Sequence, residues 1–170
     1  MTQPLSMYQA FVPGVSNTLQ ALAQVLAKGA AHCEARKIDP AAFLQARLFP
    51  DMFPLVKQVQ IACDMAKGGV ARLAGIDNPK FDDTEASFAE LQARIERTLA
   101  FMRSVSPEQI DGTEDKAIVT KRGDKETHYK GMQFLLGHAI PNVYFHSSMA
   151  YAILRTNGVV IGKRDYLGNP

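Results

Sequence analysis

The stretch that decides the fold is Gly131–Asn157, which reads GMQFLLGHAIPNVYFHSSMAYAILRTN. Its apolar residues recur at helical spacing and predict one buried face, made of Val143, Phe145, Met149, Ala152 and Ile153. His138, Asn142 and His146 follow one another at four-residue steps. We therefore expect a helix with a polar stripe beside its apolar face.

Pro141 lies in the middle of this predicted helix. Proline removes one backbone donor, and its ring crowds the carbonyl group four residues earlier. The residue at that earlier position is Gly137, which has no side chain to resist the adjustment. The sequence therefore predicts a helix that is kinked between Gly137 and Pro141, with the polar stripe close to the kink.

Two further helices are predicted in the first half of the chain. The first spans about 6–37, and Pro13–Gly14 marks either its start or a bend within it. The second spans about 54–75 and contains the pair Gly68–Gly69. Glycine weakens a helix by about 1 kcal/mol relative to alanine, so the pair indicates close approach of another helix.

A third upstream helix is expected to begin at Asp82, Asp83 or Thr84, because acidic residues suit the first turn of a helix. Its apolar stripe consists of Phe88, Leu91, Ile95, Leu99 and Met102. A β-hairpin is predicted next, because residues 116–121 and 125–129 flank a glycine turn at Arg122–Gly123–Asp124.

These elements predict an all-α fold, a four-helix bundle with a short β-hairpin excursion before the last helix. We expect one domain over 1–170, with the hairpin at about 114–130. A C-terminal tail at 159–170 is expected to pack back on the helices through Ile161, Tyr166 and Leu167.

The composition argues against several classes of protein. The chain has 19 Lys and Arg against 17 Asp and Glu, and no basic run is longer than Lys163–Arg164. A nucleic-acid-binding surface is therefore not predicted. No apolar run approaches about 18 residues, which argues against a membrane span. The N-terminus lacks a signal-peptide pattern, so we expect a cytoplasmic protein in which Cys33 and Cys63 are free, buried thiols.

Three segments resemble a known family: PDMFPLVKQVQIACDMAKG at 50–68, IPNVYFHSSMAYAILRTNGV at 140–159 and IGKRDYLG at 161–168. They resemble an uncharacterised bacterial family of the DinB/YfiT-like superfamily, a group of proposed metalloenzymes, over nearly the whole chain. The resemblance implies an up–down–down–up four-helix bundle, a homodimer, and a divalent metal, zinc or nickel, bound by three histidines. Superfamily members of known activity include thiol-dependent S-transferases and maleylpyruvate isomerases.

The chain departs from the three-histidine pattern that the resemblance implies. Two of the histidines would lie four residues apart on the last helix, where this chain has Asn142 and His146. The third would lie on the second helix, where Gln60 and Asp64 occur instead. Zinc prefers imidazole and thiolate to a neutral amide. The metal ligands that remain are His146, Asp64 and His138, which make an incomplete site.

Asp64 has two interpretations. If it lies beside His146, its carboxylate would hold the imidazole in one tautomer and raise its basicity. The alternative is a structural ion pair with Lys67 or Arg72. The sequence leaves both open, because it does not reveal whether Asp64 and His146 are adjacent.

Three functions fit these residues. The first is small-molecule binding in a cleft between the second and fourth helices, with Asn142, Gln60 and Tyr144 as pocket candidates. The second is a divalent-metal-dependent thiol transferase or isomerase, and the third is a homodimeric interaction or stress protein without enzymatic activity. Motifs typical of serine hydrolases, NTPases and dinucleotide-binding enzymes are missing from the sequence, so no catalytic residue is assigned.

Overall fold

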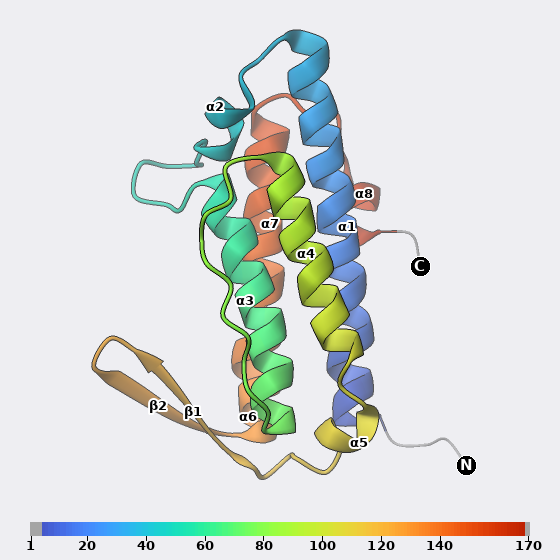
Figure 1. Cartoon of the computed structure of the whole chain (residues 1–170), viewed down its shortest axis with the longest axis vertical. Helices are drawn as coiled ribbons and strands as arrows, with labels where there is room; N and C mark the ends of the chain where they lie inside the picture. Colours follow the sequence, from blue (N-terminus) through green and yellow to red (C-terminus); the bar gives the residue numbers. More distant parts are fainter. Residues whose placement is uncertain (1–4, 169–170) are drawn as a thin grey trace.

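The computed structural model describes residues 5–168, so the first four residues of the predicted domain and the last two of the predicted tail lie outside it. Four long helices run side by side (Figure 1): α1 (Met7–Arg36), α3 (Leu55–Ala74), α4 (Phe88–Arg103) and α7 (Ile140–Thr156). The main packing contacts follow the order α1, α4, α3, α7 and back to α1. The prediction of a mostly helical chain is confirmed.

Shorter elements connect the long helices: α2 (Pro40–Leu44), α5 (Pro107–Ile110), β1 (Ala117–Arg122), β2 (Lys125–Lys130), α6 (Gly131–Phe134), the π-helical turn η1 (Leu135–Ala139) and α8 (Lys163–Leu167). The two strands pair antiparallel, with Ala117 opposite Lys130 and Arg122 opposite Lys125. The hairpin projects from the helical body at the end where α6 begins (Figure 1). The predicted hairpin is confirmed.

Helix α1 is one continuous helix through Pro13. It begins at a capping box in which Ser6 Oγ accepts from the Gln9 N–H and Gln9 Oε1 accepts from the Ser6 N–H. Thr18 Oγ1 donates to the Gly14 carbonyl. This carbonyl directly follows Pro13, which has no backbone N–H to donate. The main helix therefore starts before Pro13 and not at it.

Of the two central glycines of α3, Gly69 lies against neighbouring helical elements, whereas a Cβ atom at Gly68 would meet Arg72 of the same helix. A Cβ atom added at Gly69 would lie 2.6 Å from Cζ of the Phe11 ring on α1 and 3.4 Å from Cβ of Ala139 in η1. Phe11 is completely buried. Close approach of neighbouring elements at this position of α3 is confirmed.

The predicted start of the third long helix at Asp82, Asp83 or Thr84 is wrong. Helix α4 begins at Phe88, and Ser87 caps it by accepting from the Glu90 N–H. The segment before Ser87 is not helical because its side chains bind elsewhere, as when Asp83 forms ion pairs with Lys57 and Arg94. The predicted apolar stripe of α4 is nevertheless buried throughout.

The region around Pro141 forms a π-helical turn. The Ile140 N–H donates to the Leu135 carbonyl, one residue further back than in an α-helix. The extra residue in this turn accommodates the proline, so the predicted helix is interrupted there by η1. Of its predicted apolar face, Val143 and Ile153 are buried, Met149 and Ala152 are half-buried, and Phe145 is 53% exposed, which contradicts the prediction for Phe145. Positions two apart point to different sides of a helix.

The C-terminal segment folds back onto α1 and α7 through Ile161 and Tyr166, as predicted, but the prediction was wrong for Leu167, which is 52% exposed. Ile161 is buried, Asp165 pairs with Lys28 of α1, and the Tyr166 hydroxyl accepts from Ser148 of α7. Cys33 and Cys63 are both free and buried, and burial raises the pKa of Cys63 to about 12. None of the helices within 5–168 combines the length and the apolar character needed to cross a membrane.

Candidate functional site

A cleft of about 400 Å³ lies between α3, the η1–α7 helix and the hairpin. Its lining residues come from these elements, from α6 and from the loop before α3: Phe53, Ile61, Met65, Arg72, Thr120, Lys121, Arg122, Phe134, His138, Asn142 and His146. The structure therefore brings the complete polar stripe of the last helix into one cavity. Apolar side chains and three cationic side chains, those of Arg72, Lys121 and Arg122, line the same cavity.

His146 is held in one tautomer by a chain of hydrogen bonds. Nε2 of Gln58 donates to the Phe53 carbonyl (3.1 Å), which fixes the orientation of the Gln58 amide. Oε1 of Gln58 then faces Nδ1 of His146 at 2.7 Å. A carbonyl oxygen can only accept, so Nδ1 carries the proton and Nε2 carries the lone pair.

The Nε2 atom of His146 is open to the cleft. This atom has no hydrogen-bond partner among the described residues. It differs from the unpaired polar atoms that are fully buried there, which are Nε of Arg94 and Oγ of Ser147. Burial lowers the pKa of His146 below its ordinary value. At neutral pH the ring is therefore neutral, and it can accept a hydrogen bond or a proton from a molecule in the cleft.

His138 lies in an aromatic group that joins the hairpin to η1. Its ring stacks on Phe134 with a centroid distance of 5.5 Å, and Nδ1 lies 3.5 Å from the Tyr129 hydroxyl of β2. Burial, together with the nearby positive charge of Arg72, lowers the pKa of His138. Asn142 donates to the His138 carbonyl at 2.7 Å, which satisfies a backbone group near the proline.

The base of the hairpin is fastened to the end of α3. Lys116 Nζ, just before β1, donates to the Leu73 carbonyl at 2.7 Å, and this carbonyl lies in the last turn of α3. A lysine at this end also complements the helix dipole. The anchor positions β1 so that Thr120, Lys121 and Arg122 line one side of the cleft.

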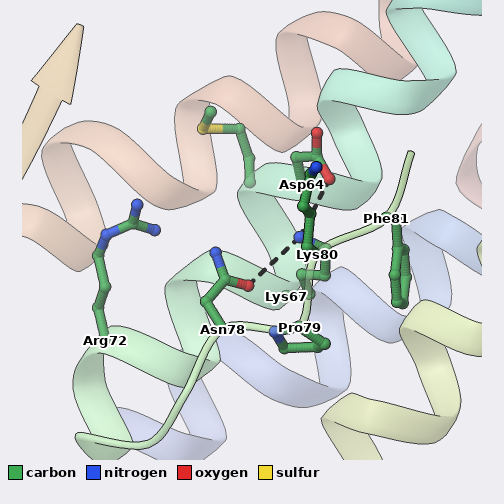
Figure 2. Close-up of a pocket in the computed structure, with 8 residues that line it drawn as sticks. Asp64, Lys67, Arg72, Asn78, Pro79, Lys80 and Phe81 are labelled. Carbon is green, nitrogen blue, oxygen red and sulfur yellow. Dashed lines mark hydrogen bonds and ion pairs between the residues drawn. The ribbon is translucent and has the colours of Figure 1, made fainter. Parts of the chain in front are cut away.

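Asp64 lies outside this cleft and lines a neighbouring cavity of about 300 Å³. Figure 2 shows it joined to Lys67, which also reaches Asn78. Its carboxylate forms an ion pair with Lys67 at 3.2 Å and accepts a hydrogen bond from Arg94 at 3.0 Å. Of the two interpretations of Asp64, the structure shows the ion pair, with Lys67 and Arg94 as its partners.

The other two pocket candidates also lie outside the cleft. Gln60 is buried on another side of α3, where it donates to Glu85 at 2.9 Å. Tyr144 is 40% exposed on α7 and does not line the cleft. Neighbouring positions on one helix face different directions, which separates Tyr144 from Asn142 and His146.

Comparison with known proteins identifies the family. The family model described as a domain of unknown function (DUF1993) matches residues 7–167. The chain belongs to the DUF1993 family. A crystal structure of a DinB family member protein from Shewanella denitrificans is 41% identical in sequence to it, with a TM-score of 0.86. That match covers 96% of this chain and 92% of the other, and no match was found among curated proteins.

This DUF1993 chain does not present the three-histidine donor set. His138 and His146 share the cleft with the amide of Asn142, and Asp64 is held by Lys67 and Arg94. Across 5–168, His, Cys, Asp and Glu side chains nowhere gather in a group of three that could hold a metal ion. The residues present therefore do not fit the metal centre that the resemblance implies.

Sequence reasoning missed the cations and much of the apolar wall of this DUF1993 cleft. From the sequence, Arg72 was named only as a possible partner of Asp64, and Lys121 and Arg122 were predicted only to lie in the hairpin. Gln58, two residues before the candidate Gln60, is the partner that orients His146. The one available signal was the four-residue step from Gln58 to Ala62 and Ala66, which places Gln58 close to the buried face of α3.

Proposed function

We propose that this DUF1993 protein binds a small organic molecule in the cleft between α3 and α7, the second and fourth of its long helices. In this proposal the four helices form a DinB/YfiT-like four-helix bundle in a single domain. The observation that carries the proposal is the His146 ring, which is neutral, held in one tautomer by Gln58, and open to the cleft through Nε2.

The lining of the cleft supports a ligand with an apolar body. Phe53, Ile61, Met65 and Phe134 contribute apolar surface. A few polar groups converge on that surface, and this combination is typical of small-molecule sites. The volume of about 400 Å³ falls within the usual range for such sites.

A cleft-filling variant tests the proposal. Ile61→Trp adds bulk to the wall of the cleft, whereas Ile76→Trp adds the same ring at an exposed position outside it. A small-molecule library would be screened by NMR against the native protein and both variants. We expect compounds that perturb amide signals of the cleft residues in the native protein and in Ile76→Trp, but not in Ile61→Trp.

Binding should also raise the melting temperature. A ligand at a hundred times its Kd adds about 2.7 kcal/mol of stability. For a domain of this size that corresponds to a rise of roughly 5–10 °C. A library that gives no hit at the cleft, or hits that Ile61→Trp still binds, would contradict the proposal.

A further inference from the structure

The cleft carries an uncompensated positive charge. Arg72, Lys121 and Arg122 are the charged side chains in its lining, which includes no Asp or Glu among the described residues. Lys121 forms an ion pair with Glu126 on the other strand. The two arginines form no ion pair with a carboxylate in 5–168, so their charges are not neutralised there.

Arg72, in the last turn of α3, lines both the cleft and the neighbouring cavity that contains Asp64. Its guanidinium lies apart from the group formed by Asp64 and Lys67 (Figure 2). Nη1 donates to the Gly68 carbonyl at 3.0 Å, within its own helix. An arginine has five N–H donors, so most of those on Arg72 are free to bind a ligand.

Arg122 enters the same cleft from a different element. It is the last residue of β1, and its cross-strand neighbour is Lys125, another cation. Two arginines from separate elements thus line one cavity that has no negative charge of its own. Like charges that line one cavity repel one another, and a bound anion relieves that repulsion.

We propose that the ligand of this cleft is an organic anion. Its carboxylate, phosphate or sulfonate group lies between Arg72 and Arg122, and its apolar body lies against Phe134 and Ile61. The planar guanidinium group binds such anions through paired hydrogen bonds. A hydroxyl or other donor on the opposite end reaches Nε2 of His146. This inference rests on the proposed function and specifies its ligand class.

The binding mode gives the hairpin a role. Because one arginine is on β1 and the other on α3, an anion between them links the hairpin to the helical body. The backbone amides of β1 and β2 should therefore exchange more slowly with deuterated solvent when the anion is bound. Binding to either arginine alone would leave the exchange of the hairpin unchanged.

Four matched probes test the ligand class: 4-hydroxyphenylacetate, its primary amide, phenylacetate and phenyl phosphate. 4-Hydroxyphenylacetate and its amide differ in charge. 4-Hydroxyphenylacetate and phenylacetate differ in the hydroxyl group. Phenyl phosphate carries a phosphate where phenylacetate carries a carboxylate. Each would be titrated into the full-length protein at low salt and followed by NMR. We expect the anions to bind at least about tenfold more tightly than the amide, the value of one charge-assisted hydrogen bond.

Variants then test whether the two arginines bind the anionic group. Arg72→Gln and Arg122→Gln should each lower the affinity for the anions about tenfold and leave that for the amide unchanged. Arg122 is exposed on the hairpin, so its replacement does not threaten the fold. Arg155→Gln, an exposed position in the last turn of α7, is the matched control and should change neither affinity.

The outcomes separate this inference from the proposed function. Equal binding of the acid and the amide at the cleft would overturn the anion inference and leave small-molecule binding intact. Anion binding that survives both arginine substitutions would also overturn it. Probes that leave the cleft signals unchanged at about 10 mM, where a ligand with a Kd of about 1 mM is mostly bound, would overturn the anion inference, and the library screen decides the proposed function separately.

Discussion

Replacing Arg94 by methionine should destabilise the protein by about 3–5 kcal/mol at pH 7. The Arg94 side chain is 0% exposed, although it carries a positive charge. Its guanidinium pairs with Asp64 at 3.0 Å, Asp83 at 3.0 Å and Glu85 at 2.9 Å. Methionine reaches about as far as Nε of arginine and has no charge, so this change keeps the apolar part of the side chain and removes the guanidinium group with its ion pairs.

Glu85 determines the size of this effect. Asp64 and Asp83 are each more than one-third exposed and keep ion pairs with Lys67 and Lys57 respectively, so they contribute little. The Glu85 side chain is only 4% exposed. Without Arg94 it retains only neutral hydrogen bonds, one of them from Gln60, and a longer contact of 3.8 Å with Arg97. A buried carboxylate that has lost its main partner accounts for most of the predicted cost.

The stability difference between the native protein and Arg94→Met should depend on pH, and the direction of that dependence tests the same reasoning. Burial alone would raise the pKa of Glu85, but hydrogen bonds from Arg94 and Gln60 lower it below its ordinary value of 4.5. In the native protein this carboxylate therefore stabilises the fold above its unfolded pKa, and that contribution is lost as the pH falls through the folded pKa. Without Arg94, burial dominates and the pKa of Glu85 rises. The cost of the substitution should shrink as the pH falls from 7 toward about 5, because Glu85 takes up a proton.

Urea unfolding of the native protein and the variant at pH 7 and at about pH 5 would measure both quantities. Arg97→Met, one turn further along α4 and 56% exposed, is the matched control and should cost less than about 1 kcal/mol. The double variant Arg94→Met/Glu85→Leu should recover much of the loss, because it removes the stranded charge. A cost for Arg94→Met below about 1 kcal/mol, or one that does not change with pH, would refute the reasoning.

Three further predictions concern the cleft and the core. Gln58→Leu removes the acceptor of the His146 Nδ1 proton, so the urea-derived free energy of unfolding should fall by about 1–3 kcal/mol; an unchanged value would mean that water replaces the amide. In a histidine NMR titration of the native protein, His146 and His138 should both titrate below the ordinary 6.5, since burial lowers both pKa values; a midpoint at or above 6.5 for either would contradict this. Gly69→Ala places a methyl group 2.6 Å from Cζ of the buried Phe11 ring, so the melting temperature should fall. Overpacking costs about 1–3 kcal/mol and outweighs a gain in helix propensity of about 1 kcal/mol; a raised melting temperature would show that the ring moves aside freely.

Local patterns in the sequence predicted the four long helices and the hairpin, but not the π-helical turn η1. The apolar spacing of α4 identified its buried stripe, and the glycine turn identified the connection of the two strands. The start of α4 was placed too early because Asp82, Asp83 and Thr84 are all good residues for a helix start. Their segment is held instead by Arg94, a partner in the next helix that a local pattern cannot reveal.

The candidate site was predictable only where its residues share one helix. His138, Asn142 and His146 were grouped correctly because four-residue steps on a helix bring side chains to one side. The position of Arg122 depends on the direction in which the hairpin folds, and this is set by contacts such as that between Lys116 and Leu73. Such long-range contacts leave no periodic signal in the sequence.

The arrangement around Arg94 also accounts for the charge of the cleft. On α3, Asp64 faces the α4 side while Arg72 borders the hairpin side. The carboxylates of Asp64, Asp83 and Glu85 are gathered by Arg94, away from the cleft lining. In our proposal the two groups of charges therefore have separate tasks, one in stability and one in ligand binding. It follows that the double variant Arg94→Met/Glu85→Leu, if folded, should bind the anionic probes with native affinity, whereas Arg122→Gln should weaken that binding without a change in stability.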